Sequence, residues 1–144
     1  MIATAKKVGD DVDDEEKDYI DELQEKEDMI TTELADCVGI MARYYKQTFV
    51  PIFHEYTPLV QALLGPETRD ADKQLGLCMF DDIIEHGGQL SQQYVQPYLP
   101  VLLSFANNEH NGIRQASVYG LGVCAQHAID IFKPFVRGTS RTAL

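Results

Sequence analysis

GIRQASVYGLGVCAQH, residues 112–127, is the stretch that decides how the rest of the sequence is interpreted. Its apolar residues recur at the three-to-four spacing of an α-helix, and small residues fill much of the same face: Ala116, Ser117, Gly120, Gly122 and Ala125. Each interior glycine costs a helix about 1 kcal/mol relative to alanine. A helix of this composition is therefore expected where another helix approaches it very closely.

Two earlier stretches are related to this one. DKQLGLCMFDDIIEH, residues 72–86, aligns with it at one shift, so that Lys73 matches Arg114, and a weaker copy spans residues 30–45. Each copy is followed by a proline-containing apolar segment, at residues 50–64, 94–103 and 131–135. Helix pairs that repeat about every forty residues are typical of HEAT and armadillo proteins. The predicted fold is all-α: a HEAT-repeat α-solenoid, a right-handed superhelix of antiparallel helix pairs, with about two and a half to three repeats.

The expected organisation is a single unit of such repeats. Because no partner helix follows residues 138–144, we expect a fragment of a longer array whose exposed apolar ends lead copies of the chain to self-associate. The expected bounds are a flexible leader at 1–13, an acidic arm at 14–28, repeat one at 29–65, repeat two at 66–107 and an incomplete repeat three at 108–144.

The net charge of −11 is concentrated near the amino end, where twelve acidic residues lie between Asp10 and Asp28 against two lysines. One interpretation is a helix that reaches back to about Glu15, with a possible break near Glu27. The other is an acidic tail that orders only against a basic partner, and a merely solvated surface is equally open. The candidate partner-binding residues of this arm are Asp13, Asp14, Glu15, Glu16, Asp18, Asp21, Glu22 and Glu25.

Composition and spacing also exclude several classes of function. No basic patch is present to neutralise phosphates, which argues against nucleic-acid binding, and no apolar run is long enough to span a membrane. Three cysteines, one per repeat, are expected to be buried free thiols in a reducing compartment: Cys37, Cys78 and Cys124. Histidine spacing suggests no metal site, and we find no nucleophile elbow or phosphate loop. We therefore expect neither an enzyme nor a cofactor.

The most site-like cluster is Asp81, Asp82, Glu85 and His86. Neighbouring helix positions point about 100° apart, so the two aspartates are not expected to converge. A solvated helix face, or contact with a neighbouring repeat, is the favoured interpretation. The matching residues Lys73 and Arg114 are expected to form a ladder that reaches carboxylates or carbonyls of adjacent repeats.

Helix ends carry their own local signals. Pro58 predicts a kink or a restart within the helix that begins near Pro51. Gly87 is expected to adopt the left-handed conformation that ends a helix, and Ser91 to cap the next one.

The pattern of Ile113-Arg114-Gln115-Ala116 followed by Leu121-Gly122 resembles the first helix of a HEAT repeat. More specifically, residues 76–86 and 114–126 are similar to consecutive repeats of the importin-beta (karyopherin-beta) superfamily, in its importin-5 (importin beta-3) branch. The resemblance covers roughly Asp10 to Val136.

The resemblance implies a soluble nuclear transport receptor that shuttles between cytoplasm and nucleus. Such receptors bind protein cargo, including cargo with basic import signals, on the concave side, and they bind the Ran GTPase in its GTP form to release it. Phenylalanine-glycine nucleoporins are contacted on the convex side. The alternative is a HEAT scaffold subunit of another complex, of phosphatase or chromosome-organising type, with no Ran dependence.

Overall fold

The computed structural model describes residues 13–142 of the chain. Helices connected by short turns make up this part, with no strand among residues 13–142, so the predicted all-α HEAT-repeat architecture is confirmed. The predicted leader at 1–13 lies outside the described residues except for its last residue, Asp13. The elements are α1 (Asp14–Tyr45), η1 (Lys46–Thr48), α2 (Val50–Leu63), α3 (Asp70–His86), η2 (Gly88–Tyr94), α4 (Val95–Phe105), α5 (Asn111–His127) and α6 (Ile129–Thr142), where η marks a 3-10 helix.

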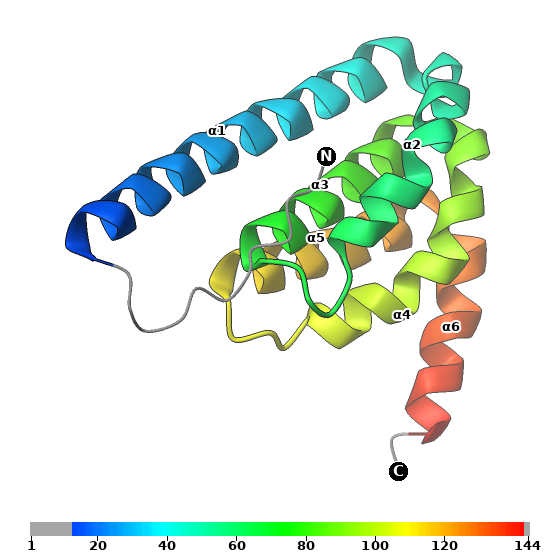
Figure 1. Cartoon of the computed structure of the whole chain (residues 1–144). Helices are drawn as coiled ribbons and strands as arrows, with labels where there is room; N and C mark the ends of the chain where they lie inside the picture. The colour runs from blue at the N-terminus through cyan, green and yellow to red at the C-terminus, as the bar shows by residue number, and fades with distance from the viewer. Residues whose placement is uncertain (1–12, 143–144) are drawn as a thin grey trace.

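The helices form two layers (Figure 1). The three related helices α1, α3 and α5 lie side by side, with α3 in the middle and in contact with both neighbours. Their followers α2, α4 and α6 lie in the second layer, and α4 contacts both α5 and α6. None of the described helices combines the length and the hydrophobicity that crossing a membrane requires.

The core is built around α3, because this helix has neighbours on several sides. Leu77 and Ile83 are fully buried, and Phe80 is only 3% exposed. The Phe80 ring lies 5.7 Å from Phe53 of α2, edge to face, and 5.0 Å from Tyr98 of α4, measured between ring centroids. Tyr94 of η2 completes this aromatic cluster at 6.1 Å from Phe80. The aromatic cluster therefore joins α3 to α2, η2 and α4.

The first helix is a single helix of 32 residues, which confirms the helical interpretation of the acidic arm without a break near Glu27. Asp13 caps it, since its carboxylate accepts a hydrogen bond from the Glu16 amide at 2.8 Å. The side that packs on α3 carries small residues such as Ala42, which is fully buried. Larger apolar side chains remain exposed on α1, including Ile30, Leu34 and Tyr44. The expected self-association through such faces stays a prediction.

Several local predictions are wrong in detail. The left-handed residue after α3 is Gly88, with φ of +62°, whereas Gly87 has φ of −77°. Ser91 lies inside η2, and its hydroxyl donates to the carbonyl of Gly88 at 2.7 Å instead of capping a helix. Helix α2 continues through Pro58 to Leu63 without a restart.

The predicted ladder of Lys73 and Arg114 between adjacent repeats is also wrong. The Lys73 ammonium donates to the carbonyl of Thr68, and the Arg114 guanidinium donates to the carbonyl of Asn108 at 2.8 Å. Each side chain thus reaches back to the turn that precedes its own helix. Lys73 and Arg114 do have the same role, because each binds a carbonyl oxygen of the turn before its own helix.

Candidate functional site

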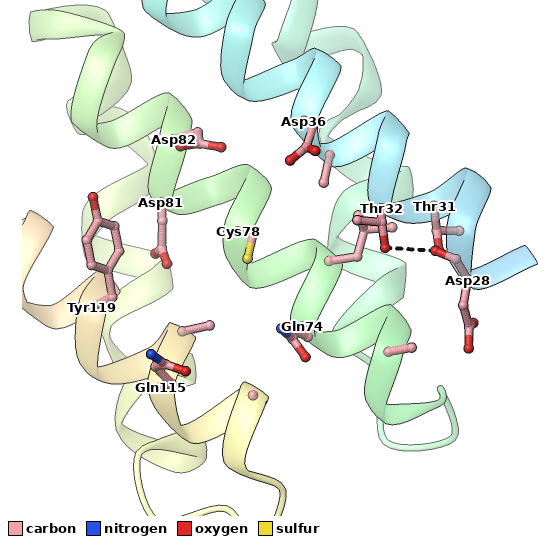
Figure 2. A pocket seen from close by; sticks show the side chains of 15 residues that line it. Asp28, Thr31, Thr32, Asp36, Gln74, Cys78, Asp81, Asp82, Gln115 and Tyr119 are labelled. Atoms are coloured by element: carbon pink, nitrogen blue, oxygen red, sulfur yellow. Dashed lines mark hydrogen bonds between the residues drawn. The ribbon is translucent and has the colours of Figure 1, made fainter. Parts of the chain in front are cut away.

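A groove of about 520 Å³ lies on the layer of α1, α3 and α5 (Figure 2). Small side chains at Ala35, Ala71 and Ala116 leave the space open, and Thr31, Gln74, Gln115 and Tyr119 line it with polar groups. Four carboxyl groups also line it: Asp28 and Asp36 of α1, and Asp81 and Asp82 of α3. The groove therefore has a mixed lining, in which carboxyl, hydroxyl and amide groups lie among small apolar side chains.

The two adjacent aspartates of α3 face opposite neighbours, as the helical rotation predicts. Asp82 lies against α1: a Cβ added to Gly39 would be only 2.6 Å from its Oδ2. Asp81 lies against α5, where a Cβ added to Gly120 would collide with its Oδ1. Figure 2 shows the two side chains pointing apart from neighbouring positions of α3. Each carboxyl group thus occupies space that a glycine of the facing helix leaves free.

Asp81 is almost completely buried, at 3% exposure. The Tyr98 hydroxyl of α4 lies 3.1 Å from its Oδ1. Burial raises the pKa of Asp81 to about 8, although the Tyr98 hydrogen bond opposes the shift, and Asp82 and Glu85 raise it further. Of the two interpretations drawn from the sequence, contact with a neighbouring helix is confirmed for Asp81 and a solvated face is wrong.

The other three residues of the cluster predicted from the sequence, Asp82, Glu85 and His86, lie close to one another. The ligand atoms of Asp82, Glu85 and His86 all lie within 4.8 Å of one another, a donor set that could hold a metal ion. Glu85 already accepts a hydrogen bond from the Tyr119 hydroxyl of α5 at 2.7 Å. This hydrogen bond raises the pKa of Tyr119 to about 12. The Glu85 carboxylate therefore serves first as a link between α3 and α5.

The cysteines differ more in burial than expected. Cys124 is buried and Cys78 partly buried, but Cys37 is exposed on α1, so the prediction of a buried thiol is wrong there. Burial raises the pKa of Cys78 to about 11 and that of Cys124 to about 12. Both thiols are therefore protonated at neutral pH and are poor nucleophiles.

The acidic arm is a solvent-exposed helix. From Asp13 to Glu27 every residue is exposed except Ile20, so the side chains predicted to bind a partner all face water. The Lys26 ammonium pairs with Glu22 at 2.7 Å within the arm. At the carboxyl end of the arm, Arg69 joins α1 to α3. The Arg69 guanidinium contacts Asp28 of α1 at 2.9 Å and Asp72 of α3 at 3.0 Å. Of the arm, only its last residue, Asp28, lines the groove.

Comparison with known proteins shows similarity to importins. A family model described as Importin repeat 6 matches residues 3–66, which include α1 and α2. The probable importin-5 homolog of Dictyostelium discoideum is 29% identical over 126 residues, which cover 85% of this chain. Importin-4 of Homo sapiens is 31% identical over 80 residues, or 56% of this chain. The chain is similar to members of the importin-beta superfamily.

The match confirms the resemblance found in the sequence, including the importin-5 branch. This superfamily consists of nuclear transport receptors. The chain spans 12% of the length of the importin-5 homolog and 7% of importin-4. It therefore corresponds to a small part of these importins, and the long acidic helix α1 lies within the part that the importin repeat matches.

Proposed function

We propose that the chain is part of a nuclear transport receptor that carries protein cargo through the nuclear pore under the control of Ran in its GTP form. It would act by protein–protein binding, without catalysis, and shuttle between cytoplasm and nucleus. The observation that carries the proposal is the importin-repeat match over α1 and α2, together with similarity to an importin-5 homolog over 85% of the chain. The proposed partners are cargo with basic import signals, Ran-GTP and phenylalanine-glycine nucleoporins.

The repeat organisation belongs to the same proposal. We propose about two and a half to three consecutive repeats, with bounds 29–65, 66–107 and, for an incomplete third repeat, 108–144. An acidic arm at 14–28 extends the first helix of repeat one. The layering of α1, α3 and α5 over α2, α4 and α6 supports this division. Stacked repeats of this kind create extended surfaces for binding proteins.

Control by Ran is tested with the full-length receptor that contains this chain. Immobilised receptor is mixed with Ran loaded with GTP or with GDP, and the bound Ran is quantified. We expect clear preference for the GTP form and release of bound cargo by Ran-GTP. Equal binding of both forms, combined with stable retention of a complex that Ran does not dissociate, would favour the alternative of a HEAT scaffold subunit.

The acidic arm is proposed to attract basic partners. Its exposed carboxylates lie on one projecting helix and are not neutralised within it except at Glu22. Charge of this kind acts mainly on the rate of encounter and is screened by salt over about 10 Å at 0.1 M ionic strength. The proposed role is therefore long-range capture of a lysine-rich segment, with the final contacts made elsewhere on the receptor.

Neutralising Asp18, Asp21, Glu22 and Glu25 to the corresponding amides tests this role. We expect the association rate with a lysine-rich import-signal peptide to fall about tenfold at low salt, because electrostatic steering is weakened. Stopped-flow fluorescence at two salt concentrations measures it, and the difference should disappear at high salt. A matched control removes four exposed acidic charges outside the arm: Glu55, Glu67, Glu109 and Asp130. An equal loss in both variants would show that only net charge matters.

A further inference from the structure

We propose that Asp82, Glu85 and His86 form a binding site for a divalent transition-metal ion, and that Zn²⁺ is the ion that fits it best. The inference rests on the convergence of three donor atoms on α3, on the lack of hydrogen-bond partners for two of the donor side chains, and on contacts from α1 and α5 that hold the carboxylates in place. Histidine spacing does not predict this site, because two of its three donors are carboxylates. The proposal does not depend on the transport function.

The first argument is the spacing along α3. Side chains three and four residues apart lie on the same face of a helix, which places Asp82 beside both Glu85 and His86. One ligand atom from each of these residues lies within 4.8 Å of the other two. The Nε2 atom of His86 lies 3.9 Å from Oε2 of Glu85, a distance too long for a hydrogen bond. Two ligands of a tetrahedral Zn²⁺ ion lie about 3.4 Å apart, so a shift of about half an ångström brings this pair onto one ion.

The second argument is that two of the donors are not already occupied. Neither the Asp82 carboxylate nor the His86 imidazole has a hydrogen-bond partner among the described residues. The charged groups that act on Asp82 are Glu85 and His86 of α3 and Asp36 and Arg43 of α1. Arg43 is the permanent cation of this set, and it forms no ion pair with Asp82. Because Asp82 is only partly exposed, a bound cation would stabilise its carboxylate.

The third argument is that neighbouring helices hold both carboxylates in place. The Tyr119 hydroxyl of α5 donates to Oε2 of Glu85 at 2.7 Å, and a carboxylate retains further lone pairs after accepting one hydrogen bond. Asp82 is directed toward α1 (Figure 2), where a Cβ added to Gly39 would be only 2.6 Å from its Oδ2. Contacts of this outer kind orient metal ligands and raise metal affinity. The donor set is therefore supported from both sides of α3.

The chemistry of the donors selects the class of metal ion. One imidazole nitrogen and two carboxylate oxygens are ligands that Zn²⁺ accepts, whereas Mg²⁺ and Ca²⁺ favour sites built from oxygen. Two negative carboxylates also match the double positive charge of the ion. Three protein ligands leave the fourth position of a tetrahedral ion to water. Because all three ligands come from α3, binding requires no rearrangement of the helices.

Isothermal titration calorimetry of the full chain with Zn²⁺ tests the site. We expect one equivalent to bind and His86→Ala to weaken binding by about tenfold or more. The matched control is His127→Ala, because His127 lies in the last turn of α5 as His86 does in α3. Cys37→Ser, which removes an exposed thiol of α1, should also keep the natural affinity. The absence of saturable binding, or a loss in either control equal to that in His86→Ala, would overturn the proposal.

A second pair of variants separates ligation from general attraction of cations. Asp82→Asn is expected to weaken Zn²⁺ binding by about tenfold or more, because it removes a ligand. Asp36→Asn removes the same charge from α1, but Asp36 is outside the donor set. Its effect is expected to stay below about fivefold, the range for a solvent-screened charge. Equal losses in the two variants would show that negative charge attracts the ion without a defined site, and would overturn the proposal.

NMR of the histidine ring signals gives a measurement that does not depend on the stability of a variant. Zn²⁺ is added to the natural chain, and the rings of all four histidines are followed: His54, His86, His110 and His127. We expect the His86 signals to shift and to saturate at one equivalent while the other three stay in place. Excess Mg²⁺ should not reverse the shift. Equal shifts at all four rings, or complete reversal by Mg²⁺, would overturn the proposal.

Discussion

Phe80→Ala lowers the free energy of unfolding by about 3–5 kcal/mol, the range for truncating a buried phenylalanine. Phe80 is 3% exposed and contacts the rings of Phe53, Tyr94 and Tyr98 at centroid distances between 5.0 and 6.1 Å. Its removal leaves a cavity at the point where three other elements meet α3. The edge-to-face contact with Phe53 is lost as well. Urea denaturation followed by circular dichroism measures the loss.

Tyr56→Ala is the matched control for this truncation. Tyr56 is also an aromatic residue, on α2, but its side chain is 56% exposed. Surface substitutions of this kind usually change stability by no more than about 0.5 kcal/mol. If Phe80→Ala cost no more than Tyr56→Ala, the aromatic cluster would not be the centre of the core.

Gly120→Ala lowers the free energy of unfolding by about 2–3 kcal/mol, whereas Gly122→Ala on the same helix raises it by about 0.5–1 kcal/mol. A Cβ at Gly120 would collide with the Asp81 carboxyl group and come within 2.7 Å of Leu102, so α5 must move away from α3. A Cβ at Gly122 meets nothing within 4 Å, and the variant gains the intrinsic helix preference of alanine. Thermal and urea denaturation of both variants measure the two effects.

The pair of glycine variants separates packing from backbone preference. Both substitutions change the same residue type, two positions apart, in the middle of α5. If both were stabilising, the close approach of α3 to α5 at Asp81 would be absent. If both were destabilising to the same degree, a second contact at Gly122 would be needed to explain the loss.

The repeat pattern was sufficient to predict the architecture. Apolar residues at helical spacing and the related stretches at 30–45, 72–86 and 112–127 predicted three related helices, which the structure shows as the layer of α1, α3 and α5. Sequence spacing carries this information because burial of one face imposes the helical period on the chain. The same pattern could not tell which apolar side of α1 is buried, since Ile30, Leu34 and Ala42 all fit a helical period.

The candidate site was predicted less completely. The rotation between Asp81 and Asp82 follows from helix geometry, but which of them is enclosed depends on where Gly39 and Gly120 meet α3. The Tyr119–Glu85 hydrogen bond joins residues 34 positions apart, and no local signal marks it. The prediction of a Lys73–Arg114 ladder is wrong because each side chain binds a carbonyl oxygen of the turn that precedes its own helix.

The stretch at residues 112–127 shows which features follow from the sequence and which depend on the tertiary structure. The sequence by itself determined that this stretch is a helix, that it belongs to a repeated series, and that its small residues allow close approach. Only the tertiary structure decided that Gly120 carries the contact with Asp81 while Gly122 faces open space. The physical reason is that periodicity reports the burial of a face averaged over many residues. A contact between single side chains instead depends on how neighbouring helices are rotated and shifted against each other.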